Sequence, residues 1–269
     1  MTHAKLAFIG GGNMAGAIFG GLLRSGWAAA SITVVEPMAE QRESIAAAWP
    51  GMYVLAAADA TLAAAEVIVW AVKPQSFAEA AAPCAPFIGG ALQLSVMAGI
   101  RSDAIVRASG SQRVVRAMPN TPALIGQGIA GLFSRAAVSA ADRALVEAVL
   151  APTGQLLWLE HEAQLDAVTA LSGSGPAYVF YFLEAMIEAG QQLGLSAEQS
   201  RTLAQQTFAG AAALAMCSDE AVPVLRERVT SKGGTTHAAI TVLEAHHVKA
   251  SFVRAMQAAH ARARELGQT

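Results

Sequence analysis

The chain has 269 residues, enough for two ordinary domains that each bury a core. Hydrophobic residues make up 54% of it, yet no apolar run approaches the roughly 20 residues of a membrane-spanning helix. A net charge of −2 without any lysine- or arginine-rich tract argues against nucleic acid as a partner. Two distant cysteines, no signal-peptide pattern and no metal-ligand spacing of histidines predict a cytoplasmic protein without a metal.

The first part of the chain alternates short β-branched runs with helical stretches, the pattern of βαβ units that build a parallel sheet. The apolar run from Val67 to Val72 lacks alternation, as in a strand buried on both faces. Strands are expected at residues 6–9, 32–35, 67–72, 92–96, 113–117, 129–133 and 155–159, and helices at 14–25 and 38–48. The fold class is therefore α/β, with a Rossmann-type parallel-sheet domain over residues 1–160.

Beyond residue 160 the composition changes to long helical patterns, which predicts an all-α domain over residues 161–269. Breaks are expected at 172–176, 194–196 and 217–223. Ser196 and Gln199 form a capping box, and Pro176 suits the first turn of a helix with Ser174 as a candidate cap. That helix carries a wide apolar stripe, made of Tyr178, Val179, Phe182, Met186 and Ile187. Burial within one chain and burial against a second copy both stay open.

A glycine-rich turn follows the first strand and opens a helix, the context in which GxGxxG/A predicts dinucleotide binding. The turn and the start of the helix consist of Gly10, Gly11, Gly12, Asn13 and Met14, with Ala15 at the third small position. Gly10 allows the tight turn, and Gly12 lets a pyrophosphate approach the backbone. We therefore expect these residues to bind a nicotinamide dinucleotide.

Glu36 stands at the end of the second strand, 20 residues after Gly16, where an acidic side chain meets the adenosine ribose. A carboxylate there accepts hydrogen bonds from a 2′-hydroxyl and repels a 2′-phosphate, which favours NADH. Arg42 is near enough in sequence to reach a phosphate instead. Glu36 as a solvated charge at the strand end is a further alternative.

Three more turns follow strands of the expected sheet, at the edge where ligands of such sheets gather. Ala71, Val72, Lys73 and Pro74 close the buried third strand, residues 95–98 with Ala98 follow the next, and residues 118–122 follow the one after. Each is a common structural turn when taken alone, but together they describe one rim. Asn120 and Thr121 are the polar candidates for the nicotinamide amide.

Residues 229–244, VTSKGGTTHAAITVLE, place hydroxyls and flexible backbone amides at the expected start of a helix. Unpaired amides and the positive end of the helix dipole attract a carboxylate there, while Gly233 and Gly234 let the backbone curl around a small ligand. The segment predicts a site for a small acid. Helix capping is the alternative role of Thr235 and Thr236.

The chain resembles the pyrroline-5-carboxylate reductase family over essentially its whole length. The motifs are FIGGGNMA at 8–15, AVKPQ at 71–75, MPNTP at 118–122, SGSGPAY at 172–178 and VTSKGGTT at 229–236. The resemblance implies a helical domain that interlocks with its partner's in a homodimer, which some members assemble further, and an active site at the dimer interface. It also implies hydride transfer from NADPH or NADH to the C=N bond of 1-pyrroline-5-carboxylate, which gives L-proline in the last step of proline biosynthesis.

By the same resemblance, the catalytic residues are Thr236, near the ring nitrogen, and Ser231, whose hydroxyl joins the carboxylate site. Because a cyclic imine can bind already protonated, Thr236 is expected to orient the nitrogen rather than act as a general acid. The other substrate-binding residues implied are Gly233, Gly234, Thr235 and Asp219. The chain departs from the family pattern at Lys232, where many members have proline, at Arg228, often asparagine, and at Ala58, near an asparagine beside the cofactor.

Two other functions fit parts of the sequence. A β-hydroxyacid-dehydrogenase-like carbonyl reductase shares the two-domain plan but relies on a lysine, and Lys232 is the only lysine near the loop. A non-catalytic NAD(P)-sensing protein would keep the glycine turn without needing GGTT. Oxidation of the reduced nucleotide on addition of substrate separates the three.

Overall fold

The computed structural model describes residues 3–267. It consists of two compact units, of which the first contains the chain up to Ser174 together with the segment from Ala259 onward. The second unit is Gly175–Ala258. The boundary at 160/161 expected from composition follows the end of the last strand, at Trp158.

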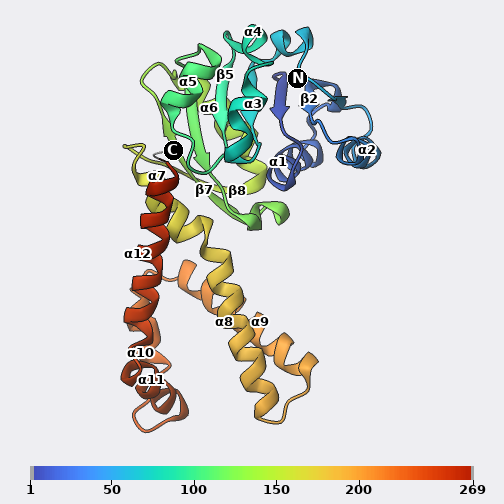
Figure 1. The fold of residues 1–269 in the computed structure, drawn as a ribbon. Helices are drawn as coiled ribbons and strands as arrows, with labels where there is room; N and C mark the ends of the chain where they lie inside the picture. Colours follow the sequence, from blue (N-terminus) through green and yellow to red (C-terminus); the bar gives the residue numbers. More distant parts are fainter. Residues whose placement is uncertain (1–2, 268–269) are drawn as a thin grey trace. The chain divides into compact units, whose positions relative to one another are not determined.

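The first unit is built on an eight-stranded sheet with the order β3-β2-β1-β4-β5-β6-β7-β8 (Figure 1). Its strands are β1 (Leu6–Ile9), β2 (Ile32–Val35), β3 (Tyr53–Leu55), β4 (Val67–Trp70), β5 (Leu92–Ser95), β6 (Val114–Met118), β7 (Gly128–Ser134) and β8 (Gly154–Trp158). The seven expected strands are confirmed. The sequence did not predict β3, which has only three residues and lies at the sheet edge with Tyr53 exposed.

Strand directions follow the expected parallel pattern except at the last two strands. β1 pairs in parallel with β2 and with β4, so that Leu6 lies between Ile32 and Val67. β7 is antiparallel to β6, and β8 is parallel to β7. An all-parallel series is therefore wrong at β7 and β8, which both run opposite to β1–β6. The connection before it holds only a short 3-10 helix, η4 (Thr121–Ile125), whereas a parallel pair requires a crossover of about a dozen residues or more.

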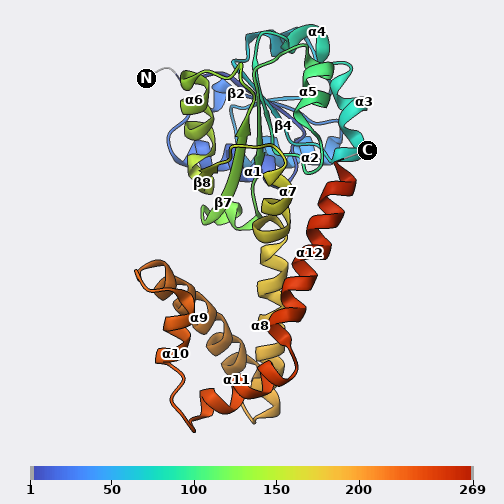
Figure 2. The same cartoon turned by 90° about the vertical axis from the view of Figure 1, so that its left-hand side faces the viewer.

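Helices cover both faces of the sheet (Figure 2), which explains why β1 and β4 are apolar on every residue. α1 (Asn13–Arg24), α2 (Ala39–Ala48) and α6 (Ala140–Leu150) pack on the face that contains Phe8. α3 (Phe77–Ala81), α4 (Ala85–Ile88) and α5 (Ser102–Ser109) pack on the face that contains Ile9. This double cover leaves the strand ends as the exposed edge of the sheet.

The second unit is helical. Its elements are α8 (Gly175–Gln192), α9 (Ala197–Met216), α10 (Val222–Arg228), α11 (Thr235–Ala245) and the greater part of α12 (Val248–Leu266). α8 and α9 lie side by side (Figure 1), so closely that a Cβ on Gly190 would stand 2.6 Å from Ser200 Oγ. The expected capping box of Ser196 and Gln199 is confirmed at the start of α9.

The break expected at 172–176 is wrong, because the chain stays helical there. α7 (Gln164–Val168) continues through a π-helical turn, Thr169–Gly173, into α8. The Ser174 amide donates to the Thr169 carbonyl over 2.8 Å, and Ser174 has helical angles, φ −82° and ψ −16°. An N-cap residue is extended, so Ser174 does not have that role. Pro176 is the second residue of α8, just after the π-helical turn.

The helical unit buries very little within one chain. Ala204 is its only buried apolar residue among the described positions 175–258, and α8, α10 and α11 have none. On α8, 57% of Phe180 and 69% of Tyr181 are exposed. Apolar surface on this scale is typical of a protein interface. No helix within residues 3–267 is both long and apolar enough to cross a membrane.

Candidate functional site

The glycine turn lies at the point where the strand order reverses, between β1 and β4, which is where such sheets bind ligands. Gly10 has a φ of 96°, and a Cβ there would stand 2.8 Å from the Ala71 carbonyl oxygen. A Cβ on Gly12, by contrast, would meet no atom within 4 Å. No side chain caps α1, so none of the amides of its first turn, which begins at Asn13, is taken up by a capping side chain. The residues present therefore fit a dinucleotide pyrophosphate.

Glu36 is buried against the glycine turn, with 7% of its surface exposed. Its Oε2 accepts from the Gly11 amide over 2.9 Å, and its Oε1 accepts from the Met38 amide over 3.0 Å. Gln41 reinforces the contact, because its side-chain amide donates to the Gly11 carbonyl over 2.8 Å. The alternative of a solvated charge is therefore wrong. Sequence reasoning missed Gln41, whose role depends on how α2 packs.

The ends of β1 to β4 enclose a cavity of about 300 Å³ beside Glu36. Its lining includes Gly10, Val35, Pro37, Ala57, Ala58 and Val72. The structure thus brings the glycine turn and the AVKP turn together around one mostly apolar space. A flat, apolar adenine ring suits such a lining.

Pro74 and Ala98 line a second cavity, of about 790 Å³, in the same unit. Lys73 is exposed directly before Pro74. Asn120 lies on a separate turn, where its Oδ1 accepts from the Ile129 amide over 3.0 Å and its NH₂ group has no partner among the described residues. The MPNTP turn also meets the SGSGPAY segment, since a Cβ on Gly173 would stand 2.7 Å from Met118 Cε. No local signal in the sequence announces that contact.

The second set of predicted residues surrounds the start of α11. Gly233 has a φ of 76°, Gly234 is the N-cap, and the Gly234 amide donates to the Ser231 carbonyl over 3.0 Å. Thr235 and Thr236 lie inside the first turn, so helix capping by either is wrong. No side chain caps this helix. A Cβ on Gly234 would stand 2.6 Å from Ser231 Oγ, which places that hydroxyl over the free helix start.

Asp219 is exposed at the other end of α10 from this loop. The adjacent Glu220 forms an ion pair with Arg228, the last residue of α10, with 2.5 Å between Glu220 Oε1 and Arg228 Nη2. The departure at Arg228 therefore has a structural role, because the pair ties the two ends of α10 together. Lys232 is exposed in the loop.

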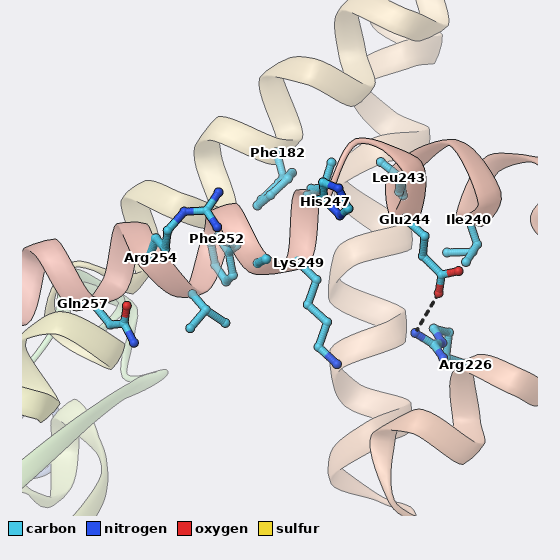
Figure 3. A pocket seen from close by; sticks show the side chains of 13 residues that line it. Phe182, Arg226, Ile240, Leu243, Glu244, His247, Lys249, Phe252, Arg254 and Gln257 are labelled. Carbon is cyan, nitrogen blue, oxygen red and sulfur yellow. Dashed lines mark ion pairs between the residues drawn. The ribbon is translucent and has the colours of Figure 1, made fainter.

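A groove of about 760 Å³ runs between α8, α11 and α12 within the helical unit. Phe182 and Phe252 form its aromatic part, with ring centroids 5.5 Å apart (Figure 3). Arg226 and Glu244 face each other at its edge over 4.0 Å. The stripe on α8 thus continues onto α12 as one open apolar surface. Sequence periodicity identified Phe182 but could not show that Phe252 meets it.

Comparison with known proteins agrees with both halves of this description. Residues 162–266 match the family model "Pyrroline-5-carboxylate reductase dimerisation", and residues 5–99 match "NADP oxidoreductase coenzyme F420-dependent". The pyrroline-5-carboxylate reductase of Pseudomonas aeruginosa is 44% identical over 270 residues, which cover 100% of this chain and 98% of the relative. That of Haemophilus influenzae is 41% identical over 99% of this chain and 98% of its own.

Solved structures are similar over the same length. The pyrroline-5-carboxylate reductase of Coxiella burnetii has a TM-score of 0.90 and 36% identity, with 99% of both chains covered. The Plasmodium falciparum enzyme, solved with NADP bound, has a TM-score of 0.89 and 28% identity, again over 99% of each chain.

A Rossmann-type sheet with a glycine turn at its switch point, joined to a helical dimerisation domain, defines an NAD(P)-dependent oxidoreductase. The chain belongs to the pyrroline-5-carboxylate reductase family. Its reaction is the NAD(P)H-dependent reduction of the C=N bond of pyrroline-5-carboxylate, the last step of proline biosynthesis. This membership decides against the carbonyl reductase and the nucleotide sensor.

Proposed function

We propose that the loop from Ser231 to Thr236 holds the carboxylate of 1-pyrroline-5-carboxylate at the start of α11. The observation that carries this proposal is the uncapped helix start with the Ser231 hydroxyl above it. A carboxylate accepts hydrogen bonds from the free amides of a first helical turn and gains from the helix dipole. Gly233, Gly234 and Thr235 supply backbone to this site, and Ser231 adds a hydroxyl.

Thr236 orients the ring nitrogen of the substrate in this proposal. A threonine inside a helix bonds back to the carbonyl four residues earlier, as Thr241 does to His237 over 2.8 Å. The corresponding residue for Thr236 is Lys232, which lies in the loop before the helix. The Thr236 hydroxyl is therefore free to contact a ligand. Since a cyclic imine can arrive protonated, no general acid is required.

The first unit holds the dinucleotide in the same proposal. Gly10, Gly11 and Gly12 with the start of α1, at Asn13 and Met14, receive the pyrophosphate, and the 300 Å³ cavity beside Glu36 receives the adenosine. Ala71, Val72, Lys73, Pro74, Ala98 and the Asn120 amide belong to the nicotinamide side. The bound reduced nucleotide supplies the hydride. The chain's task is to hold the two reacting carbons together and exclude water.

Replacement of Thr236 by alanine tests this assignment. The Thr236→Ala variant should lose about ten- to hundredfold in kcat, as expected for one lost hydrogen bond to a charged group. Its dissociation constant for the nucleotide should not change, and Thr236→Ser should recover most of the activity. Thr241→Ala is the matched control on the same helix. Wild-type turnover in Thr236→Ala would remove Thr236 from the reaction.

Two further variants separate the carboxylate site from the nitrogen site. Ser231→Ala should raise KM more than it lowers kcat, because its hydroxyl contacts a carboxylate that does not react. Asp219 is proposed as a substrate-side acid, and Asp219→Asn should change KM without a change in nucleotide affinity. An unchanged KM in Asp219→Asn would exclude Asp219 from the substrate site.

We also propose that the chain forms a homodimer through its helical unit and works in the cytoplasm. The exposed apolar side chains of α8 to α11 and the match to a dimerisation model support the dimer. Light scattering should give the mass of two chains. A mass of four chains or a higher even number would show that dimers associate further. Cell fractionation tests the location.

A further inference from the structure

The cavity proposed for the adenosine is lined by an acidic side chain and by no basic one. The 300 Å³ cavity has no lysine, arginine or histidine among its lining residues, all of which belong to the described part of the chain. Glu79 lines it directly, and Val35 and Pro37, which flank Glu36 in the chain, line it as well. A 2′-phosphate, with about −1.5 to −2 charges at pH 7, would therefore enter a site without a counter-charge.

Glu36 stands between the cavity-lining residues Val35 and Pro37 in the chain, and its carboxylate is bound by the protein. Two of its hydrogen bonds run to the Gly11 and Met38 amides, at 2.9 and 3.0 Å. An ionised carboxylate has about four acceptor positions, so two remain for the vicinal hydroxyls of a ribose. The contact to Gly11 also fixes the carboxylate at the glycine turn, beside the adenosine cavity.

Arg42, the nearest cation in sequence, is not among the residues that line the cavity. Its Nη1 donates to the carbonyl oxygens of Glu36 and Pro37, over 3.0 and 2.6 Å. These two bonds hold Nη1 against the backbone of residues 36 and 37, while Nε and Nη2 keep their donors. Asp59, directly after the cavity residue Ala58, adds a further exposed carboxylate.

We propose that this chain prefers NADH to NADPH and that Glu36 is the residue that sets the preference. The proposal rests on the dinucleotide site described above. The repulsion between two like unit charges about 6 Å apart weakens binding roughly threefold in water. At an effective dielectric constant of 20, the same repulsion weakens binding roughly a hundredfold. We therefore expect NADH to bind about tenfold or more tightly than NADPH.

Calorimetric titration of the full-length protein with each reduced nucleotide, in the absence of substrate, tests the proposal. Glu36→Gln removes the charge but keeps an acceptor oxygen for Gly11, so the NADPH to NADH ratio of dissociation constants should fall about tenfold. Glu43→Gln is the matched control, since it makes the same charge change at an exposed position of α2. The ratio in the control should stay at the wild-type value.

A second pair of variants leaves Glu36 and its hydrogen bonds intact. Ala57→Arg adds a cation at the cavity and should tighten NADPH alone, whereas Ala57→Gln adds length without charge and should not. Equal or tighter NADPH binding by the wild type, or an unchanged ratio in Glu36→Gln with native circular dichroism, would overturn the preference. Failure of both nucleotides to bind would instead remove the dinucleotide site itself, which separates the two failures.

Discussion

Glu162 is the centre of a charged network that joins β6, α5 and the start of α7. Its carboxylate accepts from the Ser102 amide over 2.6 Å, from the Ser102 hydroxyl over 2.8 Å and from Arg116 Nη1 over 2.8 Å. Only 4% of Arg116 is exposed, and its Nε has no hydrogen-bond partner. Arg116 therefore depends on Glu162 for compensation of a buried charge.

Removal of the Glu162 carboxylate should destabilise the sheet domain strongly. Glu162→Ala leaves the buried Arg116 guanidinium without its direct ion-pair partner, which costs about 3–5 kcal/mol in unfolding free energy. For a unit of this size the loss corresponds to a fall in melting temperature of about 10 °C. The double variant Arg116→Met/Glu162→Met removes both charges. Its unfolding free energy should be higher than that of Glu162→Ala by at least about 2 kcal/mol.

Urea denaturation followed by circular dichroism, at one protein concentration, measures these differences. Glu160→Ala is the matched control, since Glu160 is exposed two residues away and should change the unfolding free energy by less than about 0.5 kcal/mol. A cost below about 1 kcal/mol for Glu162→Ala would refute the argument that Arg116 is a buried charge with one essential partner.

The protonation of Glu162 gives the same network a pH dependence. Burial alone would raise the pKa of this carboxyl, but hydrogen bonds from Ser102 and the charge of Arg116 hold it below the ordinary value of 4.5. A depressed folded pKa adds stability that is present above the unfolded pKa and is lost as the pH falls through the folded pKa. The difference in unfolding free energy between wild type and Glu162→Ala should therefore shrink below about pH 4.

Three other outcomes are expected. Gly10→Ala should abolish nucleotide binding in calorimetry, because its Cβ would stand 2.8 Å from the Ala71 carbonyl oxygen, and retained affinity would contradict the turn geometry. The hydrogen bond from Arg113 lowers the pKa of Asp142 to about 2 from 3.8, so urea titrations should show wild-type stability falling between about pH 4 and pH 2 and a flatter profile in Asp142→Asn. Phe180→Asp should shift the mass measured by light scattering toward one chain, since 57% of Phe180 is exposed on the apolar face of α8; an unchanged mass would exclude that face from the interface.

Local sequence signals were sufficient for the elements and motifs that depend on nearby residues. β1 and β2 were predicted to the residue, because a short, largely apolar run followed by turn residues needs little else to specify a strand. The glycine turn and the Ser196 capping box were equally readable, since their chemistry involves residues only a few positions apart. The start of α11 was predicted for the same reason, although the N-cap proved to be Gly234.

Other features were decided only by tertiary structure, because their causes are distant in sequence. The direction of β7 depends on the length of its connection and on its neighbours on both sides. The π-helical turn before α8 overrides glycine and serine residues that locally signal a break. Glu36 bonds to Gly11 across 25 positions, and Arg116 pairs with Glu162 across 46. Local propensity is set by adjacent dihedral angles, whereas a buried charge finds its partner only after the chain has folded around it.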